Sequence, residues 1–119
     1  MPCEIRTTAK FEKEAKRLIK KYPSIKAELK KLGEALSQNP KQGDPLGKNF
    51  YKVRLAIKSK GKGKSGGARV ITNLIFRTDL TQEISRLYLA TIYDKSERET
   101  INEIELAEML NNILTSEKG

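Results

Sequence analysis

Apolar side chains recur at a helical spacing through the first third of the chain. They form two stripes, broken at Pro23, with steps of three and four residues, and this spacing is typical of amphipathic helices. The stripes are Phe11, Ala15, Leu18, Ile19 and Tyr22, and then Ile25, Leu29, Leu32 and Leu36. Ser24 is expected to cap the second helix, which ends before Asn39-Pro40. A short strand over Cys3 to Thr8 is expected before the first helix.

Beyond residue 50 the spacing changes to a period of two. In 51–58 the apolar residues alternate with Lys52, Arg54 and Lys58. This alternation predicts a strand with one face in the core and one cationic face. The stretch before it, 42–49, is rich in turn-forming residues.

Two more strands are expected, one over 68–77 and one over 84–93. In the first of them Arg69 should face away from Val70, and the second is apolar enough to be a central strand. The connection before them, 59–67, consists of Gly, Lys and Ser. Three strands with such connections predict an antiparallel meander.

The last element is predicted to be a helix that starts at Ser96. Ser96 and Glu99 have the S-x-x-E spacing of a capping box, and apolar residues continue to Leu114. The expected fold class is therefore α+β: an antiparallel β-sheet with two N-terminal helices and a C-terminal helix. At 119 residues, a single domain over 1–119 is expected.

The net charge of +9 arises in the middle of the chain. Residues 45–78 contain nine Lys or Arg and no Asp or Glu, whereas the other 15 basic residues are balanced by 15 acidic ones. A segment without acids concentrates positive potential and attracts phosphates. Nucleic acid is therefore the leading class of partner.

Composition excludes several kinds of chemistry. The chain has no His, which removes the usual general base, the commonest zinc ligand and every triad that uses His. Cys3 is the single cysteine, so no internal disulfide forms, and a lone thiol suits a reducing compartment. No apolar run approaches the ~20 residues that span a bilayer. A cytoplasmic protein without membrane partners is expected.

The Gly/Lys/Ser loop contains two nucleotide-binding motifs that its context rules out. Gly61-x-Gly63-x-x-Gly66 matches a dinucleotide fingerprint and Gly63-Lys64-Ser65 the end of a Walker loop, yet both motifs need a helix after them, and a strand follows. The loop is then either a solvated hairpin connection or a clamp that orders on a polyanion. With no acid in or beside it in the sequence, the clamp is favoured.

Three cations on the predicted strands, Lys52, Arg54 and Arg69, could hold a phosphate. The alternative is an exposed sheet face that charge keeps soluble. Tyr93 follows on the third strand, beside Asp94 and Lys95. A tyrosine there is often half-buried packing, but a hydroxyl near cations would be easier to ionise and could transfer protons.

Four stretches, taken in order, resemble the RelE/ParE toxin superfamily. They are Asn39-Pro40 with Gly43, the strand 51–55, the loop 58–71 with its Gly-Gly-x-Arg69 ending, and Ile92-Tyr93-Asp94-Lys95. The glycine–lysine loop is most similar to the HigB-like branch. The resemblance implies a toxin of a type II toxin–antitoxin pair that cleaves mRNA in the ribosomal A site. It implies attack of the ribose 2′-hydroxyl on the adjacent phosphate, without metal or other cofactor.

The resemblance also implies roles for single residues. Lys52 and Arg54 match the basic pair on the family's second strand, and Arg69 matches the arginine that contacts the scissile phosphate. Tyr93 with Asp94 matches the late-strand site of HigB-like members. The chain departs from the RelE branch at the start of the last helix, where that branch has a further arginine and a tyrosine. Ser96 and Asn102 stand there in this sequence.

The expected function is a ribosome-dependent endoribonuclease that inhibits translation. Arg69 and neighbouring lysines would stabilise the phosphorane, and Tyr93 or Lys52 would be the general base. The residues expected to hold RNA or the ribosome are Lys48, Lys58, Lys60, Lys62, Lys64 and Lys95. A cognate antitoxin is expected to cover the basic sheet face or to displace the acidic C-terminal helix.

Two alternatives remain open. A ParE-like inhibitor of DNA gyrase would stop supercoiling without cutting mRNA. A non-catalytic RNA-binding module would bind RNA with a strong salt dependence and cut nothing.

Overall fold

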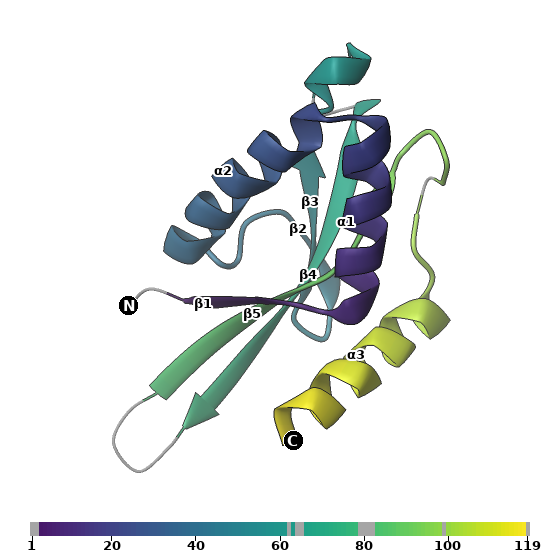
Figure 1. The fold of residues 1–119 in the computed structure, drawn as a ribbon. Coiled ribbons are helices and arrows are strands. Elements are labelled where there is room, and N and C mark those ends of the chain that lie inside the picture. Colours follow the sequence, from purple (N-terminus) through teal and green to yellow (C-terminus); the bar gives the residue numbers. More distant parts are fainter. Residues whose placement is uncertain (1–2, 62, 64–65, 79–82, 99, 119) are drawn as a thin grey trace.

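A computed structural model describes residues 3–61, 63, 66–78, 83–98 and 100–118 (Figure 1). The elements within these ranges are β1 (Glu4–Thr7), α1 (Ala9–Lys21), α2 (Ser24–Gln38), β2 (Asp44–Gly47), β3 (Phe50–Leu55), a 3₁₀ turn η1 (Lys58–Lys60), β4 (Ala68–Thr78), β5 (Glu83–Asp94) and α3 (Glu103–Lys118). The strands of the described part form one sheet in the order β1-β5-β4-β3-β2. The expected α+β class is confirmed.

The sheet is mixed, so the expectation of a purely antiparallel sheet is wrong. β3, β4 and β5 form the expected antiparallel meander with β5 inside the sheet, but β1 pairs with β5 in parallel. β1 forms the edge beside β5, and α1 and α2 carry the chain across one face of the sheet to β2 at the opposite edge.

The edge strand β2 lies within the stretch 42–49, which the sequence marks only as turns. Pro45 and Gly47 are typical of turns, so the sequence does not indicate a strand here. Proline is nevertheless tolerated on an edge strand, where its missing N–H is not needed for pairing with a second strand. Lys48 and Asn49 connect β2 to β3, and both have positive φ angles, of 52° and 64°. That backbone is typical of a type I′ hairpin turn.

The two N-terminal helices form as expected. α1 begins after Thr8, whose hydroxyl accepts a hydrogen bond of 3.0 Å from the Phe11 N–H. The expected cap of α2 is wrong: Pro23 precedes this helix without a side-chain bond. The Ser24 hydroxyl is engaged elsewhere, 2.8 Å from the hydroxyl of Ser59 on η1.

The last helix begins later than the sequence indicates. α3 starts at Glu103, and Ser96 caps no helix. The capping box is one of Asn102 and Glu105 instead: the Asn102 Oδ1 accepts from the Glu105 N–H at 2.8 Å, and Glu105 Oε1 accepts from the Asn102 N–H at 3.5 Å. Both boxes fit the same pattern, and packing onto the sheet selects the second.

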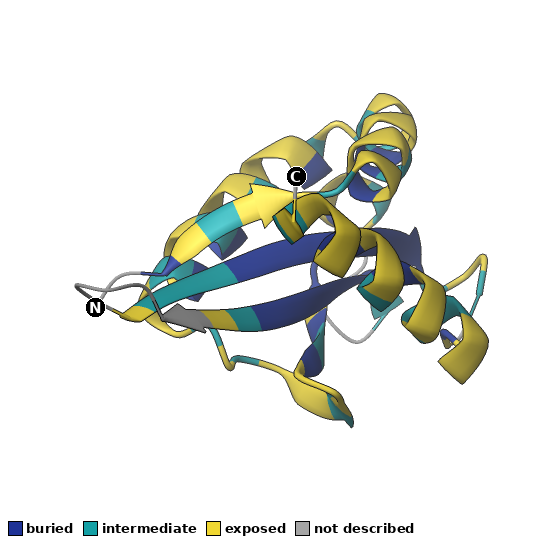
Figure 2. Ribbon diagram, turned by 90° about the horizontal axis from the view of Figure 1, so that it is seen from below, coloured by how far each residue is buried: buried dark blue, intermediate teal, exposed yellow. Residues whose placement is uncertain are grey.

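Each face of the sheet carries its own core. One face packs against α1 and α2, through Val53, Leu55, Val70, Leu87, Leu89 and Ile92, with Phe11, Leu18, Ile25 and Leu36 from the helices. The other face packs against α3, through Phe50, Ile71, Tyr88, Ala90 and Tyr93, with Ile101, Met109 and Ile113. Figure 2 shows the inner strands buried and the outer surface of α3 exposed. No helix of the described residues has the length and apolar content to cross a membrane.

A β-bulge on β5 determines which side chains share the α3 face. Ile71 pairs with Thr91 and Thr72 pairs with Leu89, so Ala90 is an extra residue on β5. Side chains of a regular strand alternate, which would place Tyr88 and Tyr93 on opposite faces. The bulge shifts the alternation, and both tyrosines belong to the core beneath α3.

Candidate nucleic-acid interface

Three of the predicted site residues lie in one row across the sheet. Arg54 on β3 is directly opposite Arg69 on β4, and Arg69 is directly opposite Tyr93 on β5. Lys52 is two residues before Arg54, so it is on the same face. Directly opposed residues have Cβ atoms about 5 Å apart. The structure therefore brings Lys52, Arg54, Arg69 and Tyr93 together, on the face that also carries α3.

Exposure falls along this row from β3 to β5. Arg54 is exposed and Lys52 is half-buried, whereas Arg69 is only 4% exposed and Tyr93 only 5%. The Arg69 guanidinium donates to the Ala68 carbonyl oxygen at 3.1 Å. One end of the row thus faces solvent, and the other end lies under the connection between β5 and α3.

The Tyr93 phenol is buried, and this makes it harder to ionise. Burial raises the pKa of Tyr93, and the positive charges of Arg69 and Arg98 offset only part of that rise. The expectation that nearby cations would favour its ionised form is therefore wrong, because desolvation is the larger effect. The Tyr93 hydroxyl has no hydrogen-bond partner among the described residues. It is a protonated phenol, which can donate a proton.

Arg98 and Ile101, in the connection between β5 and α3, form a cover over the Tyr93 end of the row. The Arg98 guanidinium lies over the Tyr93 ring, 5.5 Å from its centroid, and donates to Glu105 at 2.8 Å. Arg17 on α1 holds the same segment through two contacts of 3.1 Å to the Glu97 carboxylate. Two ion pairs therefore tie the cover to α3 and to α1.

Asp94 is separated from Tyr93 by the pleat of the sheet. It is opposite Ala68, a residue of the core beneath α1 and α2, and is 0% exposed. Its carboxylate accepts from the Lys60 ammonium at 2.9 and 3.1 Å and from the Ser96 N–H at 2.9 Å. Burial alone would raise the pKa of Asp94, but these donors outweigh it and hold the pKa below its ordinary value. The geometry gives Asp94 a role in anchoring Lys60 and does not place it beside Arg69.

The base of the cationic loop is anchored, which corrects the expectation that no acid lies beside it. Lys58 pairs with Glu28 of α2 at 3.1 Å, and Lys60 pairs with Asp94. Ser59 donates its N–H to the Ser24 hydroxyl at 2.9 Å. These acids are far away in the sequence and reach the loop only through folding. Lys62 and Lys64 lie outside the described residues.

The remaining predicted cations lie around the row. Lys48 is exposed on the β2–β3 turn, and its carbonyl oxygen accepts from the side chain of Asn73 at 3.1 Å. Lys95 follows β5 and donates its N–H to the Gly67 carbonyl oxygen at 3.0 Å. Gly67 tolerates no side chain, because a Cβ there would lie 2.1 Å from the Leu55 carbonyl oxygen. This close contact holds the end of the loop against β3.

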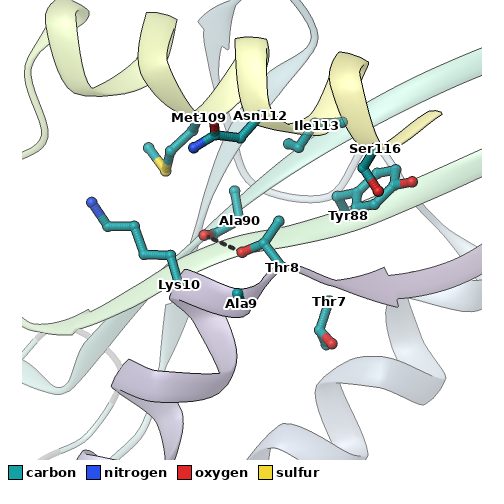
Figure 3. A pocket seen from close by; sticks show the side chains of 10 residues that line it. All are labelled: Thr7, Thr8, Ala9, Lys10, Tyr88, Ala90, Met109, Asn112, Ile113 and Ser116. Carbon is teal, nitrogen blue, oxygen red and sulfur yellow. Dashed lines mark hydrogen bonds between the residues drawn. The ribbon is translucent and has the colours of Figure 1, made fainter. Parts of the chain in front are cut away.

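A cavity of about 320 Å³ separates α3 from the start of α1 (Figure 3). Lys10 lies at one end of it, Tyr88 and Ser116 lie at the other, and the Thr8 hydroxyl donates to the Ala90 carbonyl oxygen at 2.8 Å. None of the predicted site residues among the described residues lines it.

Helix α3 is held at its far end by Glu117, which binds Arg86 at 2.8 Å and accepts from the Tyr88 hydroxyl. It is thus anchored at both ends and less completely packed between them.

Two functional candidates were not found from the sequence. In the sequence Arg98 resembles an ordinary charged residue at the start of a helix, and its contact with Tyr93 depends on the path of the chain after β5. Asn73 is 0% exposed and supports the Lys48 turn. The available signal for Asn73 was an amide close to the apolar residues Ile71 and Leu74 in a predicted strand.

Comparison with known families and folds gives no match. No protein-family model matches the chain, and no solved structure matches it. The geometry of the site and the residue pattern therefore carry the functional argument.

Proposed function

We propose that this protein is a RelE/ParE-like toxin of a type II toxin–antitoxin pair, a ribosome-dependent endoribonuclease that cleaves mRNA and so inhibits translation. The observation that carries the proposal is the row of Arg54, Arg69 and Tyr93 on adjacent strands, with Lys52 on the same face. Directly opposed positions on adjacent strands place these basic side chains close enough together to contact one phosphate of an RNA chain.

The chemistry that suits these groups is transesterification. The ribose 2′-oxygen attacks the adjacent phosphorus and the bond to the 5′-oxygen breaks, which leaves a 2′,3′-cyclic phosphate and a 5′-hydroxyl. Arg69 and Arg54 stabilise the charge that develops on the phosphorane. Tyr93, as a protonated phenol, gives its proton to the departing 5′-oxygen. Lys52 lies on the same face of the sheet, and we assign it the role of accepting the proton of the 2′-hydroxyl.

The ribosome is the expected source of substrate geometry. Tyrosine and lysine are weak proton-transfer groups at neutral pH. They can be sufficient when the ribosome holds the RNA in a reactive conformation, because this positioning already lowers the barrier to the reaction. RNA access to Tyr93 requires the cover to move, since Tyr93 lies beneath Arg98 and both Arg69 and Tyr93 are almost fully buried. Binding to the ribosome or to RNA is proposed to displace it.

The test is cleavage of mRNA on purified ribosomes. Replacing the 2′-hydroxyl 5′ to the cut by hydrogen must abolish cleavage, and a chelator selective for transition metals must leave it intact while Mg²⁺ is kept for the ribosome. Arg69→Ala should slow cleavage by about a hundredfold to a thousandfold while ribosome binding persists. Cleavage of the deoxy substrate would exclude this chemistry. Loss of gyrase supercoiling without any mRNA cutting would instead support the ParE-like alternative.

A further inference from the structure

The two N-terminal helices carry a second cationic surface, on the opposite side of the sheet from the candidate site. Between residues 9 and 38 the chain has nine Lys or Arg and four Glu. α1 and α2 pack on the sheet face that is turned away from Arg69 and Tyr93 (Figure 1). Lys10 and Arg17 lie beside Tyr93 at the edge of the candidate site, so the second surface is formed by other basic residues of the two helices.

A groove runs between the two helices and gathers part of this charge. Its volume is about 420 Å³, and its lining residues are Glu12, Lys13, Ala15, Lys16, Ile19 and Lys26. Lys13 and Lys16 are one turn apart on α1, and Lys26 belongs to α2, so both sides of the groove carry a cation. We refer to it as the α1–α2 groove.

The lysines of the α1–α2 groove are exposed and only partly compensated. Lys13, Lys16 and Lys26 form no ion pair with any residue of the described part of the chain. Glu12 lines the same groove and keeps its negative charge, because the hydrogen bond of 2.6 Å that it accepts comes from the neutral Thr7 hydroxyl. Glu14 pairs with Arg17 at 3.2 Å, and Glu28 pairs with Lys58. Three lysines and one glutamate leave the groove with an excess of positive charge that can attract an external anion.

We infer that the α1–α2 groove docks the phosphate backbone of base-paired RNA. No aromatic side chain is among the described residues that line it, whereas surfaces for single-stranded RNA stack bases on aromatic rings. Double-stranded RNA is recognised mainly through its shape, phosphates and 2′-hydroxyls, which suits lysines on two rigid helices. The choice of RNA over DNA rests on the proposed function, since ribosomal RNA is the helical polyanion that a ribosome-dependent toxin meets.

The inference assigns separate roles to the two sides of the sheet. The α3 side would hold the mRNA that is cut, and the α1–α2 groove would bind structured RNA and orient the protein. A polyanion on both sides accounts for the basic excess in α1 and α2, which lies outside the acid-free stretch 45–78.

The test compares a groove variant with a control variant of equal charge. The groove variant is Lys16→Gln/Lys26→Gln, with one change on each helix, and the control is Lys41→Gln/Lys118→Gln, which removes exposed lysines elsewhere. The probe is a blunt RNA duplex of about 16 base pairs, the length that a double-stranded RNA-binding domain spans. Binding is measured over a range of salt concentrations without ribosomes, so the result does not depend on cleavage.

We expect the slope of log affinity against log salt to fall by about 0.9 for each phosphate that the variant no longer neutralises, or about 1.8 for the groove variant. The control variant should keep the wild-type slope, and Lys16→Arg/Lys26→Arg should keep the affinity. Equal slopes for the groove and control variants would overturn the inference and leave an acidic protein as the occupant. A larger reduction in affinity for single-stranded RNA, or for a DNA duplex of the same length, would also overturn it. Failure of the cleavage tests would leave this result unaffected.

Discussion

Arg54 and Arg69 lie directly opposite each other on β3 and β4, in a stretch of sequence that contains no acid. Like charges in directly opposed positions destabilise an antiparallel pair. Arg69 is also buried, which increases the cost of holding its charge. A buried arginine directly opposite a second arginine is a local arrangement that opposes stability, and such arrangements are found mainly at functional sites.

Arg54→Gln should stabilise the free protein while weakening its binding to RNA. Removal of the opposed charge should raise the free energy of unfolding by about 0.2 to 1 kcal/mol, measured by urea denaturation. The control is Lys30→Gln, which removes a charge from an exposed position in the middle of α2. A drop in stability for Arg54→Gln alone would show that the arginine pair is favourable as it stands, and would contradict this prediction.

Tyr93→Phe separates packing from proton transfer. The hydroxyl is buried without a partner among the described residues, so its removal should leave stability unchanged or raise it by about 1 kcal/mol. Cleavage on the ribosome should nevertheless slow, because the proton donor to the 5′-oxygen is removed. A wild-type rate would exclude Tyr93 from proton transfer.

Tyr88→Phe is the matched control for Tyr93→Phe. Both rings belong to the core beneath α3, but the Tyr88 hydroxyl donates to the Glu117 carboxylate. Its removal should cost about 1.5 to 3 kcal/mol of stability, as expected for a hydrogen bond to a charged group, and leave the cleavage rate of folded protein unchanged.

Asp94→Asn should destabilise the fold by about 3 kcal/mol, the cost of breaking a buried ion pair from one side. The variant leaves Lys60 without its carboxylate and releases the base of the cationic loop. Thermal melting at neutral pH measures the effect, with the exposed Asp44→Asn as control. Near wild-type melting of Asp94→Asn would contradict the anchoring role.

The same pair predicts a loss of stability in acid. The pKa of Asp94 is lower in the folded protein than in the unfolded chain, so its contribution is complete above the ordinary Asp pKa of about 3.9 and disappears as the pH falls through the lower folded value. The melting temperatures of wild type and Asp94→Asn should therefore converge at low pH. A difference that stays constant from neutral pH to about pH 2 would contradict this linkage.

Glu105→Gln should loosen the cover over Tyr93. The amide keeps the oxygen that accepts from the Asn102 N–H but loses the charge that holds Arg98. An ion pair that is largely open to solvent is worth about 0.2 to 1 kcal/mol, so hydrogen exchange of the amides of 95–98 and 100–102 should accelerate by about fivefold at most. RNA should bind more tightly, since less energy is needed to uncover Arg69. Exchange no faster than in the exposed control Glu103→Gln would show that Arg98 does not hold the cover.

The sequence by itself determined the elements whose signal is local. The three- and four-residue steps from Phe11 to Leu36 were sufficient for α1 and α2, because one apolar stripe must face the sheet whatever its topology. The alternation in 51–55 likewise placed Lys52 and Arg54 together on one face of β3. The cationic centre of the chain was visible as composition alone.

Only the tertiary structure decided which side chains meet. The bulge at Ala90 places Tyr93 beside Arg69, and a single extra residue in a strand leaves no reliable mark in the hydrophobic pattern. Lys60 pairs with Asp94, and Arg98 lies over the Tyr93 ring. Both contacts depend on the paths of the connections before β4 and after β5. The parallel pairing of β1 and the start of α3 at Glu103 were decided in the same way, by packing on the sheet, because local propensity allowed more than one answer.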